Sequence, residues 1–385
     1  MQIEILRLSH DGRGIGYLPT GKIAFVENAL PGEVVTIETT LEKPKFVEAT
    51  VKHIEFSSPL RVEPICSVYE KCGGCDLQHL NAKEHSLVKK QWLIESLKKF
   101  AQFELEASLV EGVSFKNTFY RRRASVKVKD KKIGFFERSS HNIVDVEPCK
   151  ILSRELLAEV LKVKKQLTHK DEGELQFTLD DAKKVHIAIL KDPSKALARF
   201  QTSAEQMMIE GCLVSTRAFL QAHEDVSKVY QKDIFEAVST ESRSAKIYDL
   251  YAGFGSYSLN LQNHGFSDIE GVEENGYAVE SFPSSITSHK KKVEEWVKTL
   301  EKSNKPVVLL LNPPRIGVVG SDTFELILSK LGKSLKVILY LSCDHVTLAR
   351  DLKIPLAKDF KIETVKLYDA FPNTRHFETL VVLKR

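Results

Sequence analysis

Two segments near the carboxyl end of the chain carry residues that could perform covalent chemistry. The first is the apolar run Val337–Leu341, which leads into Ser342-Cys343-Asp344. A side chain at the carboxyl end of a central strand in an α/β sheet faces the ligand crevice. A cysteine thiolate there would be a nucleophile, and a nearby cation or helix amino terminus would lower its pKa. Taken alone, such a cysteine would more often be a buried structural thiol.

The second segment offers a proton acceptor. Residues 369–378 end in His376-Phe377-Glu378 and lead into a final apolar run, Thr379–Val382. Because His376 and Glu378 alternate with Phe377, both would face the same side of a strand. Either could act as a general base, and the alternative is a pair of solvated edge residues.

A glycine-rich turn upstream is typical of a cofactor site. The segment from Ile247 to Tyr257 predicts a strand, a turn and the start of a helix. Gly253 and Gly255 would let the backbone approach an adenosine or amino-acid group closely. Glu273, at the end of the next predicted strand, could accept hydrogen bonds from both ribose hydroxyls. The spacing D-x-x-x-G-x-G differs from the G-x-G-x-x-G of nicotinamide-binding proteins and favours S-adenosylmethionine.

Four of the six cysteines form a pattern typical of a metal site. Cys66, Cys72 and Cys75 lie close together in the sequence, and Cys149 stands far downstream. Four thiolates can hold zinc or a [4Fe–4S] cluster. Three ligands from one loop and one remote ligand favour the cluster, since zinc sites more often use two knuckles. Unrelated reduced thiols, or a redox pair at Cys72 and Cys75, are the alternatives.

Three segments of different patterning would position these residues. Residues 1–57 contain short strand-like runs separated by Gly and Pro-Gly turns, which predict a small β-barrel suited to oligonucleotides. Residues 58–215 combine the cysteines with strand-like runs and helical stretches, so an α+β domain is expected. Within residues 216–385, apolar runs alternate with helical stretches from Ile247 onward, and this alternation predicts a parallel α/β sheet.

Composition narrows the class of protein. The chain has 385 residues, of which 42% are hydrophobic and 28% charged, as in a globular protein of two or three domains. We expect a cytoplasmic protein, because the chain shows neither a membrane-spanning run nor a signal peptide. The net charge of +4 hints at a polyanionic partner. The basic segment 119–132 could contact phosphates and stack on bases, or could be an exposed basic strand without a ligand.

Together these motifs resemble the RNA 5-methyluridine methyltransferase family, in particular its ribosomal RNA branch. The similar segments extend along nearly the whole chain. They are Gly12–Gly16 and Ala29–Glu33, which resemble the TRAM signature, Phe219–Gln221, the nucleophile motif Ser342-Cys343 with Thr347–Asp351, and the base motif Phe371–Glu378.

The resemblance implies a fold and a set of site residues. The implied architecture is a Rossmann-like S-adenosylmethionine methyltransferase domain at residues 216–385, an OB-type TRAM barrel at 1–57 and an α+β iron–sulfur domain at 58–215. Cys343 would be the nucleophile and Glu378 the base. The implied cofactor-binding residues are Gln221, Tyr251, Gly253, Ser256, Glu273 and Asn312, and the implied [4Fe–4S] ligands are Cys66, Cys72, Cys75 and Cys149.

The implied reaction transfers a methyl group to carbon 5 of an RNA uridine. Uracil carbon 5 is a poor nucleophile, but attack of the Cys343 thiolate at carbon 6 would turn it into an enolate-like carbon that accepts a methyl group. Glu378 would then remove the carbon-5 proton so that the thiolate can leave. The expected substrate is 23S ribosomal RNA, with a transfer-RNA uridine as the alternative. We expect a monomer without a membrane partner.

The chain departs from the family pattern at several positions. They are His223, Ser256, Lys292, Asn312 and Asp344-His345. The family usually has an aspartate where Asn312 stands, so a catalytically weakened RNA-binding paralogue is a second hypothesis. An amino-group methyltransferase is a third, because Asn-Pro-Pro resembles the motif of such enzymes. That reading leaves the expected nucleophile and base without a role.

Overall fold

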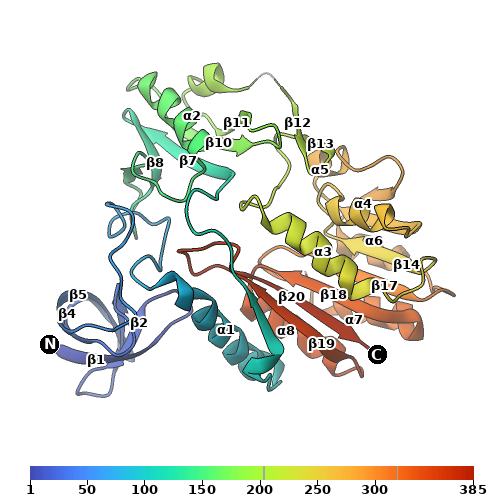
Figure 1. The fold of residues 1–385 in the computed structure, drawn as a ribbon, viewed down its shortest axis with the longest axis horizontal. Helices are drawn as coiled ribbons and strands as arrows, with labels where there is room; N and C mark the ends of the chain where they lie inside the picture. The colour runs from blue at the N-terminus through green and yellow to red at the C-terminus, as the bar shows by residue number, and fades with distance from the viewer. Residues whose placement is uncertain (203, 319) are drawn as a thin grey trace.

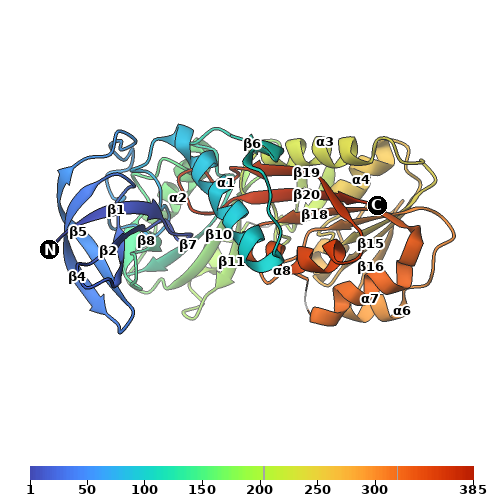
Figure 2. The ribbon, with the colours of Figure 1, turned by 90° about the horizontal axis from the view of Figure 1, so that it is seen from below.

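The computed structural model describes residues 1–202, 204–318 and 320–385. Three bodies follow one another along the long axis of the molecule. Figure 2 shows the amino-terminal barrel at one end, a smaller sheet beside it and a large sheet at the other end. The expected pockets lie on or between these bodies. The contacts among the three bodies therefore determine which residues line each pocket.

The amino-terminal body is a closed five-stranded barrel. Its strands are β1 (Gln2–Leu8), β2 (Gly14–Tyr17), β3 (Ile23–Glu27), β4 (Val34–Glu42) and β5 (Phe46–Phe56), in the order β1-β2-β3-β5-β4. Alternate side chains fill its interior, as the period of a strand requires. Gly16 is needed where β2 pairs with β1, because a Cβ atom there would lie 2.4 Å from the Glu4 carbonyl oxygen. Closure leaves the barrel without an unpaired edge.

The central body is a five-stranded antiparallel sheet covered by one helix. The sheet has the order β11-β10-β7-β8-β9, and the helix is α2 (Arg154–Lys165). Ser153 caps this helix by accepting a hydrogen bond from the Leu156 backbone N–H at 3.2 Å. The strands are β7 (Arg123–Lys129), β8 (Lys132–Phe136), β9 (Ile143–Asp145), β10 (Gly173–Leu179) and β11 (Val185–Lys191). A hairpin of β12 (Gln206–Ile209) and β13 (Cys212–Ser215) leads onward to the large sheet.

The large sheet has eight strands in the order β16-β15-β14-β17-β18-β20-β19-β6. The first five of these are parallel, as predicted, whereas β20 is antiparallel to β18 and to β19. The reason is the short connection at residues 369–377, which cannot make the crossover that a parallel neighbour needs. The strands are β6 (Val110–Val113), β14 (Lys246–Leu250), β15 (Asp268–Glu273), β16 (Thr287–Lys290), β17 (Val307–Leu311), β18 (Leu335–Ser342), β19 (Lys361–Tyr368) and β20 (Glu378–Lys384).

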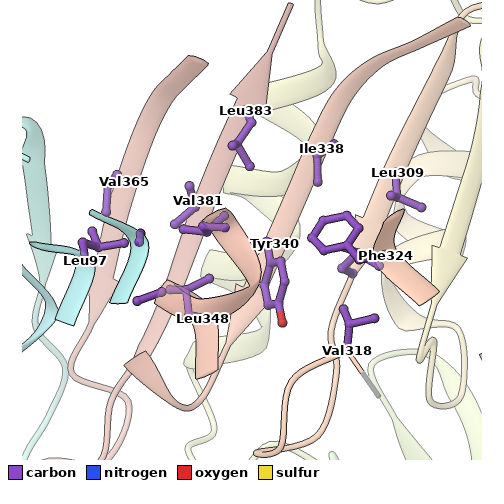
Figure 3. Packing of buried hydrophobic residues seen from close by; sticks show 14 of the residues in the cluster. Leu97, Leu309, Val318, Phe324, Ile338, Tyr340, Leu348, Val365, Val381 and Leu383 are labelled. Carbon is purple, nitrogen blue, oxygen red and sulfur yellow. The ribbon is translucent and has the colours of Figure 1, made fainter. Parts of the chain in front are cut away.

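Helices cover both faces of this sheet (Figure 1). On one face lie α3 (Val226–Val238) and α4 (Ser256–Asn263), which pack into one hydrophobic cluster. The second cluster, on the other face, takes in α1, α6, α7 and α8, and Figure 3 shows Leu97, Phe324 and Leu348 packed there against sheet residues such as Tyr340. These helices are α1 (His85–Ser96), α6 (Val293–Thr299), α7 (Ser321–Leu331) and α8 (His345–Leu356). Burial on both faces explains the wholly apolar run of β17.

The middle of the sequence also contributes to the large sheet. Strand β6 pairs with β19 at its edge, and Leu93 of α1 is fully buried in the second cluster. These two elements therefore connect the cysteine-containing segment directly to the carboxyl-terminal body. Across the described ranges, none of the helices has the length and apolar character that a membrane crossing requires.

Candidate active site

The antiparallel pairing of β20 with β18 places Cys343 and Glu378 side by side. Ser342, the last residue of β18, pairs with Thr379, so Cys343 follows one strand end where Glu378 begins the other. Alternate residues of both strands pack into the α3–α4 cluster. Continuing that alternation puts the Cys343 and Glu378 side chains on the same face of the sheet.

Burial controls the protonation of both groups. The Glu378 residue is 4% exposed, and burial raises the pKa of its carboxyl to about 8, although the Arg315 cation opposes the shift. Burial also raises the pKa of the Cys343 thiol to about 12, with a further increase from the Glu378 carboxylate and a decrease from Arg315. The two groups therefore interact with each other and share one cation. The charged form of each disfavours that of the other.

A pocket of about 410 Å³ opens beside Cys343. Its walls come from the barrel turn Ser9–Asp11, from Arg315 and from the loop Arg375–Phe377, as well as from the start of α8. Concave sites of this size, with aromatic and cationic walls, suit one planar polar ligand such as an extruded nucleobase. The barrel thus forms part of the wall around the thiol.

The departure at Asp344-His345 has a structural explanation. Asp344 caps α8 by accepting hydrogen bonds from the Val346 and Thr347 backbone N–H groups at 3.1 and 2.8 Å. An aspartate does this as well as an asparagine. The His345 ring stacks on Phe377, with ring centroids 5.2 Å apart and planes 10° apart. Both residues therefore stabilise the wall of the Cys343 pocket.

Arg315 is a site residue that the sequence analysis missed. It follows Pro314 in the loop after β17, and α8 holds this loop from one side. The Thr347 hydroxyl donates to the Arg315 carbonyl oxygen at 3.0 Å, and Asp351 accepts from the Val318 N–H at 2.8 Å. The signal was available, because a cation directly after a strand end and two prolines stands at the ligand edge of the sheet.

The glycine turn after β14 has the shape of a ligand cradle. The Gly253 N–H donates to Glu273 at 3.0 Å, which ties the turn to the end of β15. Gly253 has φ +59°, and a Cβ atom there would have no neighbour within 4 Å, so the backbone faces open space. Gly255 has φ +79°, and the Phe282 ring lies 2.7 Å from where its Cβ would be. The turn therefore needs glycine for its conformation at one end and for close packing at the other.

Four of the six expected cofactor residues line one pocket at this turn. They are Gln221, Gly253, Ser256 and Asn312. Glu273 holds the rim of the turn, and a carboxylate that accepts from backbone N–H groups still has lone pairs for a ribose. Tyr251 directs its hydroxyl toward Glu294 at 3.5 Å and has φ +60°, an unusual conformation for an aromatic residue. The turn, the acid and the neighbouring strand end thus fit an adenosyl ligand.

Glu210, at the tip of the β12–β13 hairpin, is a second residue that the sequence analysis missed. It lines the same pocket and accepts hydrogen bonds from the Ser256 hydroxyl at 2.5 Å and from Arg122 at 2.9 Å. Ser256, which replaces the family's asparagine, is thereby anchored to the hairpin. No local motif marks Glu210, because the hairpin reaches the pocket only through the tertiary fold.

The arginines of the basic segment are not a free surface. Arg122 is 4% exposed and donates to the Gln221 carbonyl oxygen at 3.2 Å. Arg123 donates to the Ala218 carbonyl oxygen at 2.7 Å. Arg122 and Arg123 therefore form neither an exposed basic strand nor a free surface for phosphates. They hold the segment that carries Gln221 against the central sheet.

Two further departures lie outside the pockets. His223 is 1% exposed and stacks on Tyr120, with centroids 4.7 Å apart and planes 13° apart. Lys292 is an exposed residue at the start of α6, and its side chain makes no capping hydrogen bond. His223 is therefore a change in packing against Tyr120. The structure offers no explanation for Lys292.

The four patterned cysteines line one small pocket between the cysteine loop and the central sheet. Cys66, Cys72, Cys75 and Cys149 all contribute to it. Within the described ranges, no three His, Cys, Asp or Glu side chains are close enough together to hold a single metal ion. The four thiols nevertheless share one pocket, which is the arrangement that a group held by several cysteines requires.

Comparison with known proteins places two parts of the chain in families. Residues 277–385 match the family model described as tRNA (Uracil-5-)-methyltransferase, and residues 1–52 match the TRAM domain. The 23S rRNA (uracil(1939)-C(5))-methyltransferase of Shewanella piezotolerans is 28% identical over an alignment that covers 100% of this chain and 95% of that protein. An uncharacterized RNA methyltransferase of Aquifex aeolicus is 27% identical, with 100% and 98% covered.

The fold has a solved counterpart. The tRNA (uracil-54, C5)-methyltransferase of Pyrococcus abyssi, solved in complex with S-adenosyl-L-homocysteine, superimposes with a TM-score of 0.73 at 21% identity, and the match covers 100% of both chains. This likeness confirms the expected architecture of a barrel combined with a methyltransferase fold. The chain therefore carries a methyltransferase domain of the RNA uracil-5-methyltransferase family behind an amino-terminal TRAM domain.

Proposed function

We propose that this enzyme methylates carbon 5 of a uridine in 23S ribosomal RNA, with Cys343 as nucleophile and Glu378 as base. The observation that carries the proposal is the juxtaposition of these two groups at the facing ends of β18 and β20. The relatives named for the ribosomal reaction match over the full chain, which supports the choice of substrate. The three-domain division at residues 57/58 and 215/216 and the monomeric state remain predictions.

The side chains divide the reaction between them. S-adenosylmethionine, held at the glycine turn, supplies an electrophilic methyl group when it is bound. The Cys343 sulfur adds to carbon 6 of the uracil, which makes carbon 5 nucleophilic. After methylation Glu378 accepts the carbon-5 proton, the carbon 5–carbon 6 double bond re-forms and the sulfur leaves.

Glu378 is a better base candidate than His376. Burial and the neighbouring Arg315 lower the pKa of His376 to about 4, so its ring is a weak proton acceptor. Burial raises the pKa of Glu378 to about 8, which makes its carboxylate a stronger proton acceptor than the His376 ring. His376 also lies in the loop before β20 rather than on the strand.

Trapping with a fluorinated substrate tests the proposal. A 23S ribosomal RNA fragment that contains 5-fluorouridine should form a denaturation-resistant complex with the protein, because fluorine cannot be removed as a proton. The Cys343→Ala variant should form none, while Cys212→Ala, which changes a buried cysteine on β13, should react normally. Normal methylation by the Cys343→Ala variant would refute the mechanism.

Two further measurements separate the alternatives. Calorimetry with S-adenosylmethionine distinguishes an enzyme from an RNA-binding paralogue, since the proposal requires binding at the turn around Gly253. Mass mapping of 5-methyluridine in cells that lack the protein distinguishes the ribosomal from the transfer-RNA substrate. Loss of the modification from transfer RNA alone would overturn the ribosomal assignment.

The cysteine pocket is proposed as a [4Fe–4S] site. The support is the shared pocket of Cys66, Cys72, Cys75 and Cys149 and the chemistry of four thiolates. Anaerobically purified protein should be brown and contain about 4 Fe per chain, the stoichiometry of one cubane cluster. A colourless protein that contains zinc would contradict this assignment.

A further inference from the structure

The position of Glu378 depends on the loop that precedes it. Residues 369–377 connect β19 to β20, and Glu378 is the first residue of β20. Pairing with β18 holds the strand from Thr379 onward, but the carboxylate lies at its open end. The shape of the loop therefore decides where this carboxylate sits relative to Cys343.

One buried lysine from a distant helix holds this loop. Lys89 of α1 donates from its Nζ atom to the Asp369 carboxylate at 2.5 Å, to the His376 carbonyl oxygen at 2.9 Å and to the Phe371 carbonyl oxygen at 3.4 Å. An ammonium group has three N–H donors. All three acceptors belong to the segment 369–376, one at its first residue and one two residues before Glu378.

The surroundings of Lys89 make this contact specific. The side chain is 0% exposed, and Asp369 is 3% exposed. A buried ion pair is weak evidence for stability, because two well-packed apolar side chains are often as stable. Such a pair is more useful for fixing one arrangement of the chain, since the ammonium group must find its acceptors at defined places. Here those places are the two ends of the loop at residues 369–377, which is called the base loop because it precedes the proposed base, Glu378.

We propose that Lys89 is a positioning residue for the base, holding both ends of the Asp369–His376 loop so that Glu378 faces the uracil bound at Cys343. The inference rests on the proposed function, because it assigns Lys89 to the proton-removal step of that reaction. The three hydrogen bonds of the buried Lys89 amine go to this loop, so its effect on the substrate is indirect.

Kinetics of the Lys89→Met variant test the proposal. Methionine has a similar length but none of the three donors. We expect kcat to fall by at least about tenfold, since misplacing a catalytic group by about 1 Å can cost on the order of 100-fold. The KM for RNA should change less than kcat, because the barrel turn, Arg315 and the start of α8 still line the pocket when the loop shifts. With unmodified uridine RNA, a larger fraction of enzyme should be found covalently attached to RNA on denaturing gels, because proton removal has become slow.

Matched variants keep the test decisive. Lys90→Met makes the same change one residue along α1, where the amine donates to the Ala107 carbonyl oxygen at 2.8 Å, and it should behave as wild type. Lys89→Arg, which keeps the charge and its donors, should recover part of kcat. If Lys89→Met alone does not fold, Lys89→Met/Asp369→Asn removes both charges and should fold with the same kinetic defect.

The outcomes separate this inference from the proposed function. A folded Lys89→Met variant with wild-type kcat would overturn the positioning role, as would a fall in kcat without any rise in covalent complex. A change confined to KM would also overturn it. Failure of the wild-type protein to form a complex with 5-fluorouridine RNA would instead refute the proposed function.

Discussion

At the scale of the residue, catalysis depends on the protonation states of Cys343 and Glu378. Cys343 must lose a proton to attack, and Glu378 must be ready to receive one, yet burial favours the neutral form of both. The Arg315 cation acts to lower the pKa of both groups, because it stabilises their charged forms. Substrate binding expels further water, so the strength of these interactions should increase in the complex.

The pH dependence of catalysis follows from the raised pKa of Glu378. A base acts in its deprotonated form, so activity should be low where the carboxyl is protonated and should rise as the pH increases through about 8. Single-turnover rates measured between about pH 6 and 10 would follow this rise, because that range extends roughly two pH units to either side of the pKa. In Glu378→Gln the covalent RNA complex should form and persist, because nothing removes the carbon-5 proton. Rapid release of methylated RNA by this variant would contradict the role of Glu378.

At the scale of the element, helix α8 organises the loop that carries Arg315. Asp351 on α8 accepts hydrogen bonds from the Val318 N–H at 2.8 Å and from the buried Tyr340 hydroxyl at 2.6 Å. Gly317 fits only because it lacks a Cβ atom, which would lie 2.4 Å from the Asp351 carboxylate. One buried acid therefore joins the loop after β17, the strand β18 and the helix that follows Cys343.

Removing this acid should destabilise the protein more than removing one of its donors. Asp351→Ala leaves the Val318 N–H and the Tyr340 hydroxyl without their acceptor, and each unsatisfied buried group costs about 1–3 kcal/mol. We expect a loss of roughly 2–4 kcal/mol in the free energy of unfolding, measured by urea denaturation. Tyr340→Phe removes one donor but leaves the carboxylate other partners, so its cost should be about 1 kcal/mol. Equal costs would contradict the anchoring role of Asp351.

A second prediction at this scale concerns the packing under the glycine turn. A Cβ atom on Gly271 of β15 would lie 2.3 Å from the Phe282 ring, so Gly271→Ala should lower the free energy of unfolding by about 1–3 kcal/mol. It should also weaken S-adenosylmethionine binding, since the same ring supports Gly255. The double variant Gly271→Ala/Phe282→Leu should recover part of both losses in denaturation and calorimetry. No recovery would show that the ring is not the obstacle.

At the scale of the whole molecule, the three bodies meet around a shared pocket of about 600 Å³. Arg13 of the barrel, Lys127 of the central sheet and Arg375 of the base loop all line it, together with several carboxylates. Since the barrel turn Ser9–Asp11 also borders the Cys343 pocket, a bound RNA strand could run from the central sheet past the barrel to the thiol. Cations from all three bodies therefore meet at the junction, interspersed with carboxylates.

The salt dependence of RNA binding tests this path. A lysine that neutralises one phosphate contributes about one unit to the slope of log K against log salt concentration. Lys127→Ala should reduce that slope by about 1 and weaken binding of the substrate RNA, with little change in the methylation rate of RNA that is already bound. Lys170→Ala, an exposed lysine outside this pocket, serves as the control. An unchanged slope would remove Lys127 from the RNA path.

The sequence by itself determined the local elements and their chemistry. Apolar alternation predicted the barrel and the parallel core strands, and the glycine turn with Glu273 indicated an adenosyl site. These features are local, because strand period, turn residues and motif spacing act over a few residues. The same local patterns could not find Glu210, whose role depends on partners far away in the sequence. Arg315 was missed although its place directly after a strand end is a local signal.

Only the tertiary structure decided how the reacting groups meet. The antiparallel entry of β20 beside β18 places the start of one strand at the end of the other, which brings Glu378 to Cys343. A parallel strand at this position would have put Glu378 at the opposite edge of the sheet. The buried arginines of the basic segment and the reach of Lys89 into the base loop likewise arise from packing between segments that no sequence period connects.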